Sequence, residues 1–259
     1  MLLRKRIYFV ADIHLGNCYL TNASDAEKKL AQWLDSIKMD ASAIYFLGDI
    51  FDYWYEYKHV VPRGNVRFLG KLAELSDSGV EIHILIGNHD IWMFDYLHEE
   101  VGAFIHHNPF TVELLGKNFF LGHGDEVGRR KFYYRFLQGM FRNRVCQILY
   151  STIHPYWSFS LARFLSLSSR KSGLTAEKIK LSQLRNTTVL EEFAKNYLKT
   201  HPDINFFIFG HLHILLDRQL SPSSRLIITG DWMQQFSYTV WDGEQLSLNR
   251  LFSMPTHCI

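Results

Sequence analysis

The chain has 259 residues, enough for one large domain or for one domain with a sizeable insertion. Hydrophobic residues make up 47% of it and charged residues 21%, which is typical of a globular protein and excludes an intrinsically disordered one. The net charge is only +2, but the segment from Val127 to Arg185 contains twelve Lys or Arg and one acid, Glu177. That segment therefore carries +11 and the rest of the chain −9, an asymmetry that requires an explanation.

The cysteines and the N-terminus favour a cytoplasmic protein. Three cysteines, Cys18, Cys146 and Cys258, lie far apart without the paired spacing of a disulfide framework. The basic N-terminus resembles the start of a signal peptide, but the apolar run after it is short and is broken by Asp12 and His14, so we interpret it as the first strand. No apolar run reaches the eighteen or so residues that span a membrane.

The first ninety residues alternate between strand and helix patterns. Apolar, β-prone runs at 7–11, 43–47 and 82–86 predict three strands. Between them, apolar residues recur at helical spacing over about 26–37 and 64–78. This alternation indicates an α/β sheet with helices packed on it.

After Asp90 the β content falls into a second block. Residues 92–100 predict a short helix, and residues 111–120 predict a hairpin that turns at Gly116-Lys117. Residues 225–252 are rich in strand signals and turn at Asp242-Gly243. We therefore predict two sheets packed face to face, each covered by helices.

Residues 127–185 have no strand signal and are rich in Arg, aromatic residues and Leu, so we predict a helical insertion within a single domain spanning 1–259. Apolar residues recur there at helical spacing, as at Trp157 and Leu161. Two interpretations explain this spacing equally well: the apolar residues pack against the host domain, or they contact a ligand. The basic residues that flank them suit an anionic lipid surface or phosphate groups.

Five predicted strands end in polar motifs. Taken singly, each motif has an ordinary structural explanation, such as a turn or a core hydrogen bond, but five in succession after apolar runs do not. The motifs are Asp12-Ile13-His14, Gly48-Asp49-Ile50-Phe51-Asp52, Gly87-Asn88-His89-Asp90, Gly122-His123-Gly124-Asp125 and Gly210-His211-Leu212-His213. Carboxylates, an amide oxygen and imidazoles without nearby thiolates suit Mn²⁺, Fe²⁺ or Zn²⁺. We place Asp49 at the centre of this edge, shared by two metal ions.

This motif set resembles that of the calcineurin-like metallophosphoesterases. The resemblance implies an α/β fold, a four-layer α/β/β/α sandwich, with a two-metal centre at the strand ends. It implies that Asp12, His14 and His213 hold the first ion, that Asn88, His123 and His211 hold the second, and that Asp49 bridges them. Two such ions can clamp a phosphate and stabilise the attacking and leaving oxygens of an in-line displacement.

His89 receives no ligand role from the resemblance. In the superfamily the histidine after the asparagine sits near the leaving group, where an imidazole can donate a proton or hold phosphoryl oxygens. We therefore expect His89 to be catalytic together with Asp49. Asp90 is expected either to orient His89 or another ligand, or simply to cap a helix.

The substrate is indicated by a second resemblance. Gly48 to Trp54, Gly122 to Asp125, Tyr134-x-Phe136 and Gly230-Asp231-Trp232 together resemble the UDP-2,3-diacylglucosamine hydrolases of lipid A biosynthesis in Gram-negative bacteria. The resemblance implies hydrolysis of the pyrophosphate to UMP and 2,3-diacylglucosamine 1-phosphate, with Mn²⁺ as the usual metal. The best-known branch of that family has Arg at the position of His89, whereas a second branch has His, as this chain does.

This substrate has consequences for binding and location. The partners we expect are a nucleotide-linked glycolipid and an anionic membrane surface, so the protein would be associated peripherally with the inner membrane from the cytoplasmic side, without an obligate protein partner. The insertion would form a cap over the metals. The candidate substrate contacts are Asp125, Tyr134, Arg163, Arg170 and Lys171.

The sequence also allows three other hypotheses about function. In the first, the enzyme is a metallophosphodiesterase or nuclease whose +11 segment binds a nucleic-acid backbone, although that segment is more apolar than such a surface needs. The second is a lipid-binding protein without activity, which the filled metal positions disfavour, and the third is a protein phosphatase. Phe51, Tyr53 and Trp54 either line a path from the metals to the insertion or pack the helix that follows them.

Overall fold

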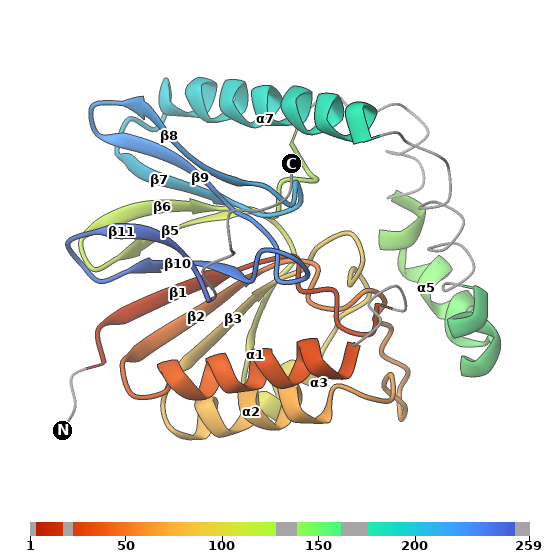
Figure 1. The fold of residues 1–259 in the computed structure, drawn as a ribbon. Helices are drawn as coiled ribbons and strands as arrows, with labels where there is room; N and C mark the ends of the chain where they lie inside the picture. The colour runs from red at the N-terminus through yellow and green to blue at the C-terminus, as the bar shows by residue number, and fades with distance from the viewer. Residues whose placement is uncertain (1–3, 18–22, 128–138, 162–175, 252–259) are drawn as a thin grey trace.

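The computed structural model describes residues 4–17, 23–127, 139–161 and 176–251. Two β-sheets lie face to face between two layers of helices, as the resemblance implied (Figure 1). The first sheet contains, in spatial order, β11 (Leu246–Arg250), β10 (Ser237–Trp241), β1 (Arg6–Val10), β2 (Ala41–Leu47), β3 (Glu81–Leu85) and β4 (Phe104–His106). The second contains β5 (Phe110–Leu114), β6 (Lys117–Leu121), β7 (Ile204–Phe209), β9 (Ser224–Thr229) and β8 (Leu215–Ser221).

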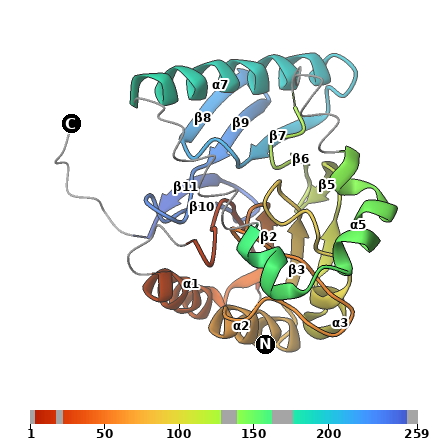
Figure 2. The same cartoon turned by 90° about the vertical axis from the view of Figure 1, so that its right-hand side faces the viewer.

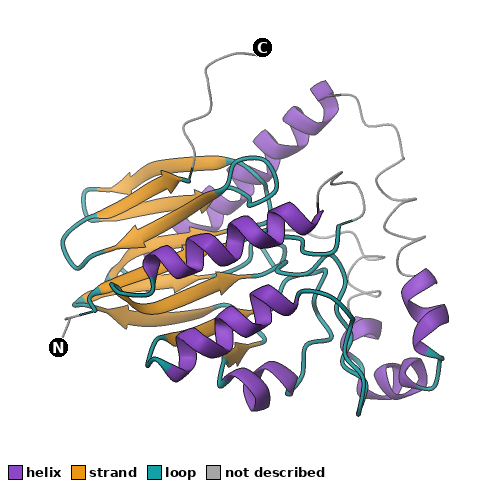
Figure 3. Cartoon of the chain, turned by 60° about the horizontal axis from the view of Figure 1, so that its bottom comes forward, coloured by secondary structure: helices purple, strands orange, loops and turns teal. Residues whose placement is uncertain are grey.

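Helices cover the outer face of each sheet (Figures 1 and 3). Helices α1 (Ala23–Ile37), α2 (Val66–Asp77) and α3 (Tyr96–Val101) pack on the first sheet, and α7 (Ala176–Leu198) packs on the second. The alternation of side chains along each strand explains the layers: Phe9 and Tyr45 face the opposite sheet, whereas Tyr8 and Ile44 face the helices. The predicted pair of helix-covered sheets is thus confirmed.

The parallel strands deliver their carboxyl ends to one edge of the sandwich. Strands β1, β2 and β3 are parallel neighbours in the first sheet, and β6, β7 and β9 are parallel neighbours in the second. The loops that follow them therefore gather at the same edge, on the right of Figure 1, and Figure 2 looks onto it. Helix α5 (Arg144–Ser151) lies beyond this edge.

Helix α3 begins at Tyr96, four residues later than the start predicted from the sequence. The buried carboxylate of Glu56 accepts the backbone N–H groups of Phe94, Asp95 and Tyr96 at 2.6, 2.8 and 3.2 Å. It thus satisfies the free donors of the first turn. Trp92, expected to be helical, instead forms a parallel bridge with Tyr55. The sequence pattern missed this because the capping group comes from a distant loop.

The β5–β6 hairpin turns one residue earlier than predicted. Leu114 pairs with Lys117, so the turn residues are Leu115 and Gly116, with φ of 48° and 78°. A leucine rarely adopts positive φ, which is why the glycine-lysine pair looked like the better turn. Strand β8 was not predicted at all, because its central residues are exposed and polar, as befits an edge strand.

The described part of the insertion is helical and lies against the loop that follows Asp49. Besides α5, residues 139–142 and 155–161 are helical. The hydroxyls of Tyr53 and Tyr150 lie 2.9 Å apart, and the hydroxyl of Tyr55 donates to the carbonyl of Gln147 at 2.7 Å. By contrast, Phe51 and Trp54 are fully buried and stack on each other at 4.0 Å in the core under α2, so of the three aromatic residues only Tyr53 points toward the insertion.

Many apolar side chains of this helical segment are exposed. Trp157 and Leu161, interpreted from the sequence as packing or ligand-contact residues, are 66% and 48% exposed. The other exposed apolar side chains of the segment are Met140, Phe141, Val145, Ile148, Leu149, Ile153 and Tyr156. Within the described part of the chain, no helix has the length and apolarity needed to cross a membrane.

Candidate metal centre

The loops at the sheet edge hold their polar residues in an unusual backbone conformation. Among the residues that the structure describes, eight other than glycine have positive φ, and the five that belong to the predicted metal-binding set are Asp12, His14, Asp49, His211 and His213, with φ between 50° and 67°. Such a conformation costs about 1 kcal/mol or more per residue and persists only where the surrounding structure enforces it. Its concentration at one edge is an independent sign of a functional site.

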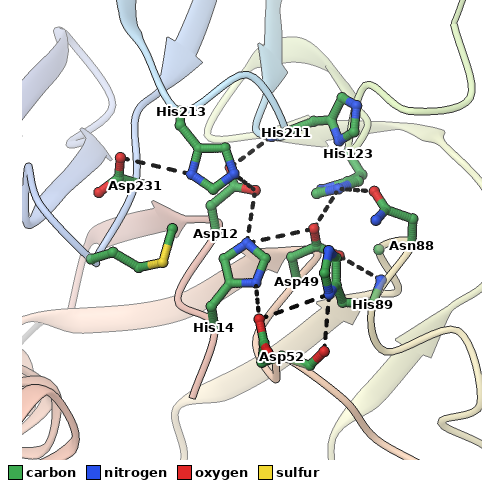
Figure 4. Close-up of polar contacts among 12 residues, drawn as sticks. Asp12, His14, Asp49, Asp52, Asn88, His89, His123, His211, His213 and Asp231 are labelled. Carbon is green, nitrogen blue, oxygen red and sulfur yellow. Dashed lines mark hydrogen bonds and ion pairs between the residues drawn. The ribbon is translucent and has the colours of Figure 1, made fainter. Parts of the chain in front are cut away.

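The first group of predicted ligands comprises Asp12, His14 and His213 (Figure 4). Oδ1 of Asp12 lies 3.9 Å from Nε2 of His14 and 3.7 Å from Nε2 of His213. The two imidazole rings stack with their centroids 5.2 Å apart. One carboxylate oxygen and two ring nitrogens therefore converge on one small space.

The second group lies beside the first and comprises Asp49, His123, His211 and Asn88 (Figure 4). Nδ1 of His123 donates to the carbonyl oxygen of Leu47 at 2.8 Å, which fixes the ring and turns Nε2 toward the centre. Nε2 lies 3.3 Å from both Oδ1 of Asn88 and Oδ2 of Asp49. All seven predicted ligands are thus brought together.

Asp49 lies between the two groups. Its Oδ2 is 3.7 Å from Nε2 of His14 in the first group and 3.3 Å from Nε2 of His123 in the second. Its Oδ1 accepts the backbone N–H of His89 at 2.9 Å. This is the position that a bridging carboxylate requires.

Two glycines let the loops approach this closely. A Cβ on Gly87 would overlap Oδ1 and the backbone nitrogen of Asp49, and a Cβ on Gly48 would overlap the His123 ring. Gly48 also has φ of 90°. The glycines of the strand-end motifs are therefore needed for contact between loops rather than for turning alone.

The pKa shifts within the cluster indicate that its buried carboxylates lack positive charge to balance them. Burial raises the pKa of Asp12. Burial also opposes the ionisation of Asp49, but His123, His89 and His14 outweigh it and hold the pKa of Asp49 well below its usual value. Burial alone would lower the pKa of His123, yet the Asp49 carboxylate raises it well above the usual value, so a proton stands in for a cation.

Several buried polar atoms in the cluster have no hydrogen-bond partner. Two of them, Oδ1 of Asp12 and Nε2 of His14, are converging atoms of the first group, whereas the other two, Nδ1 of His14 and Nδ1 of His213, lie near carboxylates. Such atoms are costly to bury unless something satisfies them. Oxygen and nitrogen donors without thiolates suit a borderline or hard divalent ion. The donor set, its geometry and the unsatisfied atoms are therefore compatible with a divalent metal centre.

Two carboxylates to which sequence analysis gave no role support the histidines of the first group. Oδ1 of Asp52 lies 3.3 Å from Nδ1 of His14, and Oδ2 of Asp231 lies 3.7 Å from Nδ1 of His213 (Figure 4). The backbone N–H of Trp232 also donates to the carbonyl of Asp12 at 3.1 Å. The Asp231 turn therefore holds both ends of the first group.

Within the described residues, the hydrogen bonds of Asp90 go to the backbone of two loops, and none of them goes to the ring of His89 or to the start of a helix. It is fully buried, and its two oxygens accept the backbone N–H groups of Gly87 and Ile50, both at 2.7 Å. It thereby ties the loop that carries Asn88 to the loop that carries Asp49. Burial, followed by repulsion from Asp49, raises the pKa of Asp90 to about 6. The interpretation of Asp90 as a helix cap is wrong, because α3 starts six residues later.

His89 lies at the rim of the cluster with its side chain 27% exposed. Nδ1 donates to the carbonyl oxygen of Asp52 at 2.9 Å, and the ring meets His14 edge-on at 4.7 Å. Because a carbonyl can only accept, Nδ1 carries a proton, and Nε2 is the nitrogen left for other chemistry.

The candidate substrate contacts divide between described and undescribed segments. Asp125 is half-buried and stands two residues after His123, a predicted ligand of the second group. Its neighbour Glu126, not singled out from the sequence, accepts the backbone N–H groups of His123 and Gly124 at 3.0 and 2.8 Å. The remaining candidates, Tyr134, Arg163, Arg170 and Lys171, lie outside the described residues.

Comparison with known proteins agrees with this geometry. Residues 5–215 match the calcineurin-like phosphoesterase family. The chain is 45% identical to a UDP-2,3-diacylglucosamine hydrolase of Porphyromonas gingivalis (strain ATCC BAA-308 / W83), over 97% of this chain and 100% of the relative. It is 27% identical to a protein of the same name from Ectopseudomonas mendocina (strain ymp), over 92% and 95% of the two chains. The chain therefore belongs to the calcineurin-like phosphoesterases and, among them, to the family of UDP-2,3-diacylglucosamine hydrolases.

Proposed function

We propose that this protein hydrolyses the pyrophosphate bond of UDP-2,3-diacylglucosamine and releases UMP and 2,3-diacylglucosamine 1-phosphate. The observation that carries the proposal is the convergence of six other predicted ligands around Asp49, in a chain 45% identical to a hydrolase of that name. Asp12, His14 and His213 would hold one divalent ion, Asn88, His123 and His211 the other, and Asp49 both. We expect Mn²⁺ in these positions, with Fe²⁺ or Zn²⁺ able to replace it.

The reaction adds one water molecule across a P–O–P bond and gives two phosphate monoesters. Bound ions supply the positive charge that stabilises the attacking and leaving oxygens. The chain itself preorganises the ligands: Asp49 spans both groups, Leu47 fixes the ring of His123, and Asp90 locks the loops together. Because these side chains and loops are already in place, they need not rearrange during the reaction.

His89 is the residue we assign to proton transfer. The hydrogen bond from Nδ1 to Asp52 leaves Nε2 at the exposed rim of the cluster, where a substrate oxygen can reach it. A protonated imidazole there can donate to the leaving phosphate oxygen or hold a phosphoryl oxygen. Asp52 lies against His14 and His89 and so would keep both rings in place.

The insertion, 127–185, would cap the centre and bring it to a lipid surface. Exposed apolar side chains such as Trp157 and Leu149 lie on it, and the first turns of α7, which also belong to it, have exposed Leu181, Leu184 and Lys180. Apolar and basic groups together suit acyl chains and anionic headgroups. A nucleic-acid surface would not need the apolar side chains. We therefore propose peripheral association with the cytoplasmic face of the inner membrane.

The decisive experiment incubates the purified protein with UDP-2,3-diacylglucosamine and Mn²⁺ and measures UMP release. Bis-p-nitrophenyl phosphate serves as a generic substrate in parallel. Release of UMP supports the proposal. Hydrolysis of the generic ester without UMP release would refute the lipid substrate while leaving the metal centre in place.

A further inference from the structure

A second recess lies beside the metal centre, between the core and the insertion. It is a cleft of about 310 Å³, near the lower end of the range for small-molecule sites. Its walls come from the loops after β3 and β4 on one side and from the helical residues 139–151 on the other. The residues that line it are Ile86, Ile91, Phe94, His107, Asn108 and Arg142, with Gln147 at the margin.

The cleft and the metal centre share one loop. Ile86 and Ile91 line the cleft and bracket the segment Gly87–Asp90, which carries Asn88 and His89 into the centre. The backbone N–H of Ile86 donates to the carbonyl of His106 at 3.0 Å, which joins the loops after β3 and β4. Residues of one loop therefore line the cleft and enter the metal centre.

The polar groups of the cleft are available to a ligand. In the part of the chain that the structure describes, the side chains of Arg142, His107 and Asn108 make no hydrogen bond or ion pair. The amide of Gln147, by contrast, donates to the carbonyl of Phe141 and helps to fix the wall. A few exposed polar side chains beside apolar ones are a usual composition of a small-molecule site.

We propose that this cleft binds the nucleoside monophosphate end of the substrate. The inference rests on the proposed function, because it requires a substrate with a nucleotide at one end and acyl chains at the other. The apolar wall of Ile86, Ile91 and Phe94 can take the face of a flat base. The amide of Asn108 offers one donor group and one acceptor, which match the imide edge of uracil. Arg142 and His107 offer donors to ribose and phosphate oxygens.

The size and polarity of the cleft indicate which end of the substrate it binds. A cleft of about 310 Å³ is too small for a sugar with two acyl chains, and it carries a cation in its wall. The extended apolar face around Trp157 and Leu149 lies outside it. The nucleotide therefore belongs in the cleft and the acyl chains belong elsewhere on the insertion.

The test measures binding of UMP and of inorganic phosphate to the Mn²⁺-loaded protein by calorimetry. Inorganic phosphate reports on the metals alone, whereas UMP also needs the cleft. Arg142→Ala and Asn108→Ala should each weaken UMP binding about tenfold and leave phosphate binding unchanged. Arg185→Ala removes an exposed arginine of α7 outside the cleft and is the matched control.

The same variants separate this inference from the proposed function. With UDP-2,3-diacylglucosamine, Arg142→Ala should raise KM about tenfold, and it should cleave bis-p-nitrophenyl phosphate normally. An unchanged KM, or equal affinity for UMP in wild type and both variants, overturns the cleft assignment even if the lipid is hydrolysed. Conversely, UMP binding that depends on Arg142 supports the cleft even if the nucleotide-lipid is not cleaved.

Discussion

Oδ2 of Asp231 lies 3.7 Å from Nδ1 of His213, and the same oxygen accepts a hydrogen bond from the amide of Gln235 at 3.1 Å. The other oxygen accepts the backbone N–H groups of Gln234 and Gln235 at 2.7 and 3.1 Å. The carboxylate is thus held firmly behind the histidine ring. Carboxylates in this position raise the basicity of metal-binding histidines and fix their orientation.

Asp231→Asn should therefore weaken binding of the first metal ion by about 10- to 100-fold. Asparagine keeps an acceptor for the backbone N–H groups but loses the charge behind His213. Competitive metal titration against a chromogenic chelator measures the change directly. Asp77→Asn, at an exposed site on α2, is the control and should bind metal as the wild type does. Equal affinities for both variants would show that Asp231 has only a structural role.

Gly87→Ala should disrupt the centre, because the added Cβ would overlap the carboxylate and backbone nitrogen of Asp49. We expect a loss of roughly 1–3 kcal/mol in the free energy of unfolding and a marked loss of bound metal. Gly70→Ala is the matched control, since nothing lies within 4 Å of its Cβ position in α2. That change should stabilise the protein by about 0.5–1 kcal/mol. Urea unfolding and metal analysis of both variants measure these effects, and a Gly87→Ala variant with full metal content would contradict the argument.

His89→Ala should lower kcat by about 10²- to 10⁴-fold while both metal ions stay bound. The reason is that its Nδ1 is engaged with the carbonyl of Asp52 and its side chain is partly exposed, so we assign the ring to proton transfer rather than metal binding. Asp49→Ala, by contrast, should lose turnover and metal together. Steady-state kinetics combined with metal analysis separates the two cases. Loss of metal from His89→Ala would make His89 a ligand, as its proximity to His14 and Asp49 also permits.

The sequence was sufficient to predict which residues meet at the centre, because each strand-end motif is local and parallel strands bring their ends to one edge. It was not sufficient to predict what supports them. Asp231 and His213 are neighbours only in space, and the bond from Trp232 to Asp12 joins residues at opposite ends of the chain. Glu56 likewise determines the start of α3 from 40 residues away in the sequence. The positive φ of the ligands could not be predicted either, since Asp and His adopt it more often than most residues but still only rarely.

Removal of metal with a chelator should lower the midpoint of thermal unfolding. Without a cation, Oδ1 of Asp12 and Nε2 of His14 stay buried without a hydrogen-bond partner. At a metal concentration 100 times the dissociation constant, binding contributes about 2.7 kcal/mol to the free energy of unfolding. Differential scanning fluorimetry across a range of Mn²⁺ concentrations measures the effect. An unfolding midpoint that does not depend on Mn²⁺ would refute metal binding at this edge.

A pair of histidines away from the centre should make stability depend on pH. Nδ1 of His83 lies 3.1 Å from Nε2 of His106, and the His106 ring stacks on Phe110 with centroids 4.0 Å apart. Burial, and then repulsion from His83 and His107, lowers the pKa of His106 from its ordinary value of 6.5 to about 4. Burial also lowers the pKa of His83.

Since the folded-state pKa of His106 lies below the unfolded one, the unfolded chain binds more protons between pH 6.5 and 4. The contribution of His106 to stability is therefore complete above pH 6.5 and is lost as the pH falls toward 4. Because the ring is partly exposed, we expect a loss on the order of 1 kcal/mol. When the pH falls from 7 to 4.5, the free energy of unfolding of His106→Gln, measured with urea, should decrease less than that of the wild type. His59→Gln, at an exposed histidine, should follow the wild type. If the stability of His106→Gln depended on pH as that of the wild type does, groups other than His106 would be responsible for the dependence.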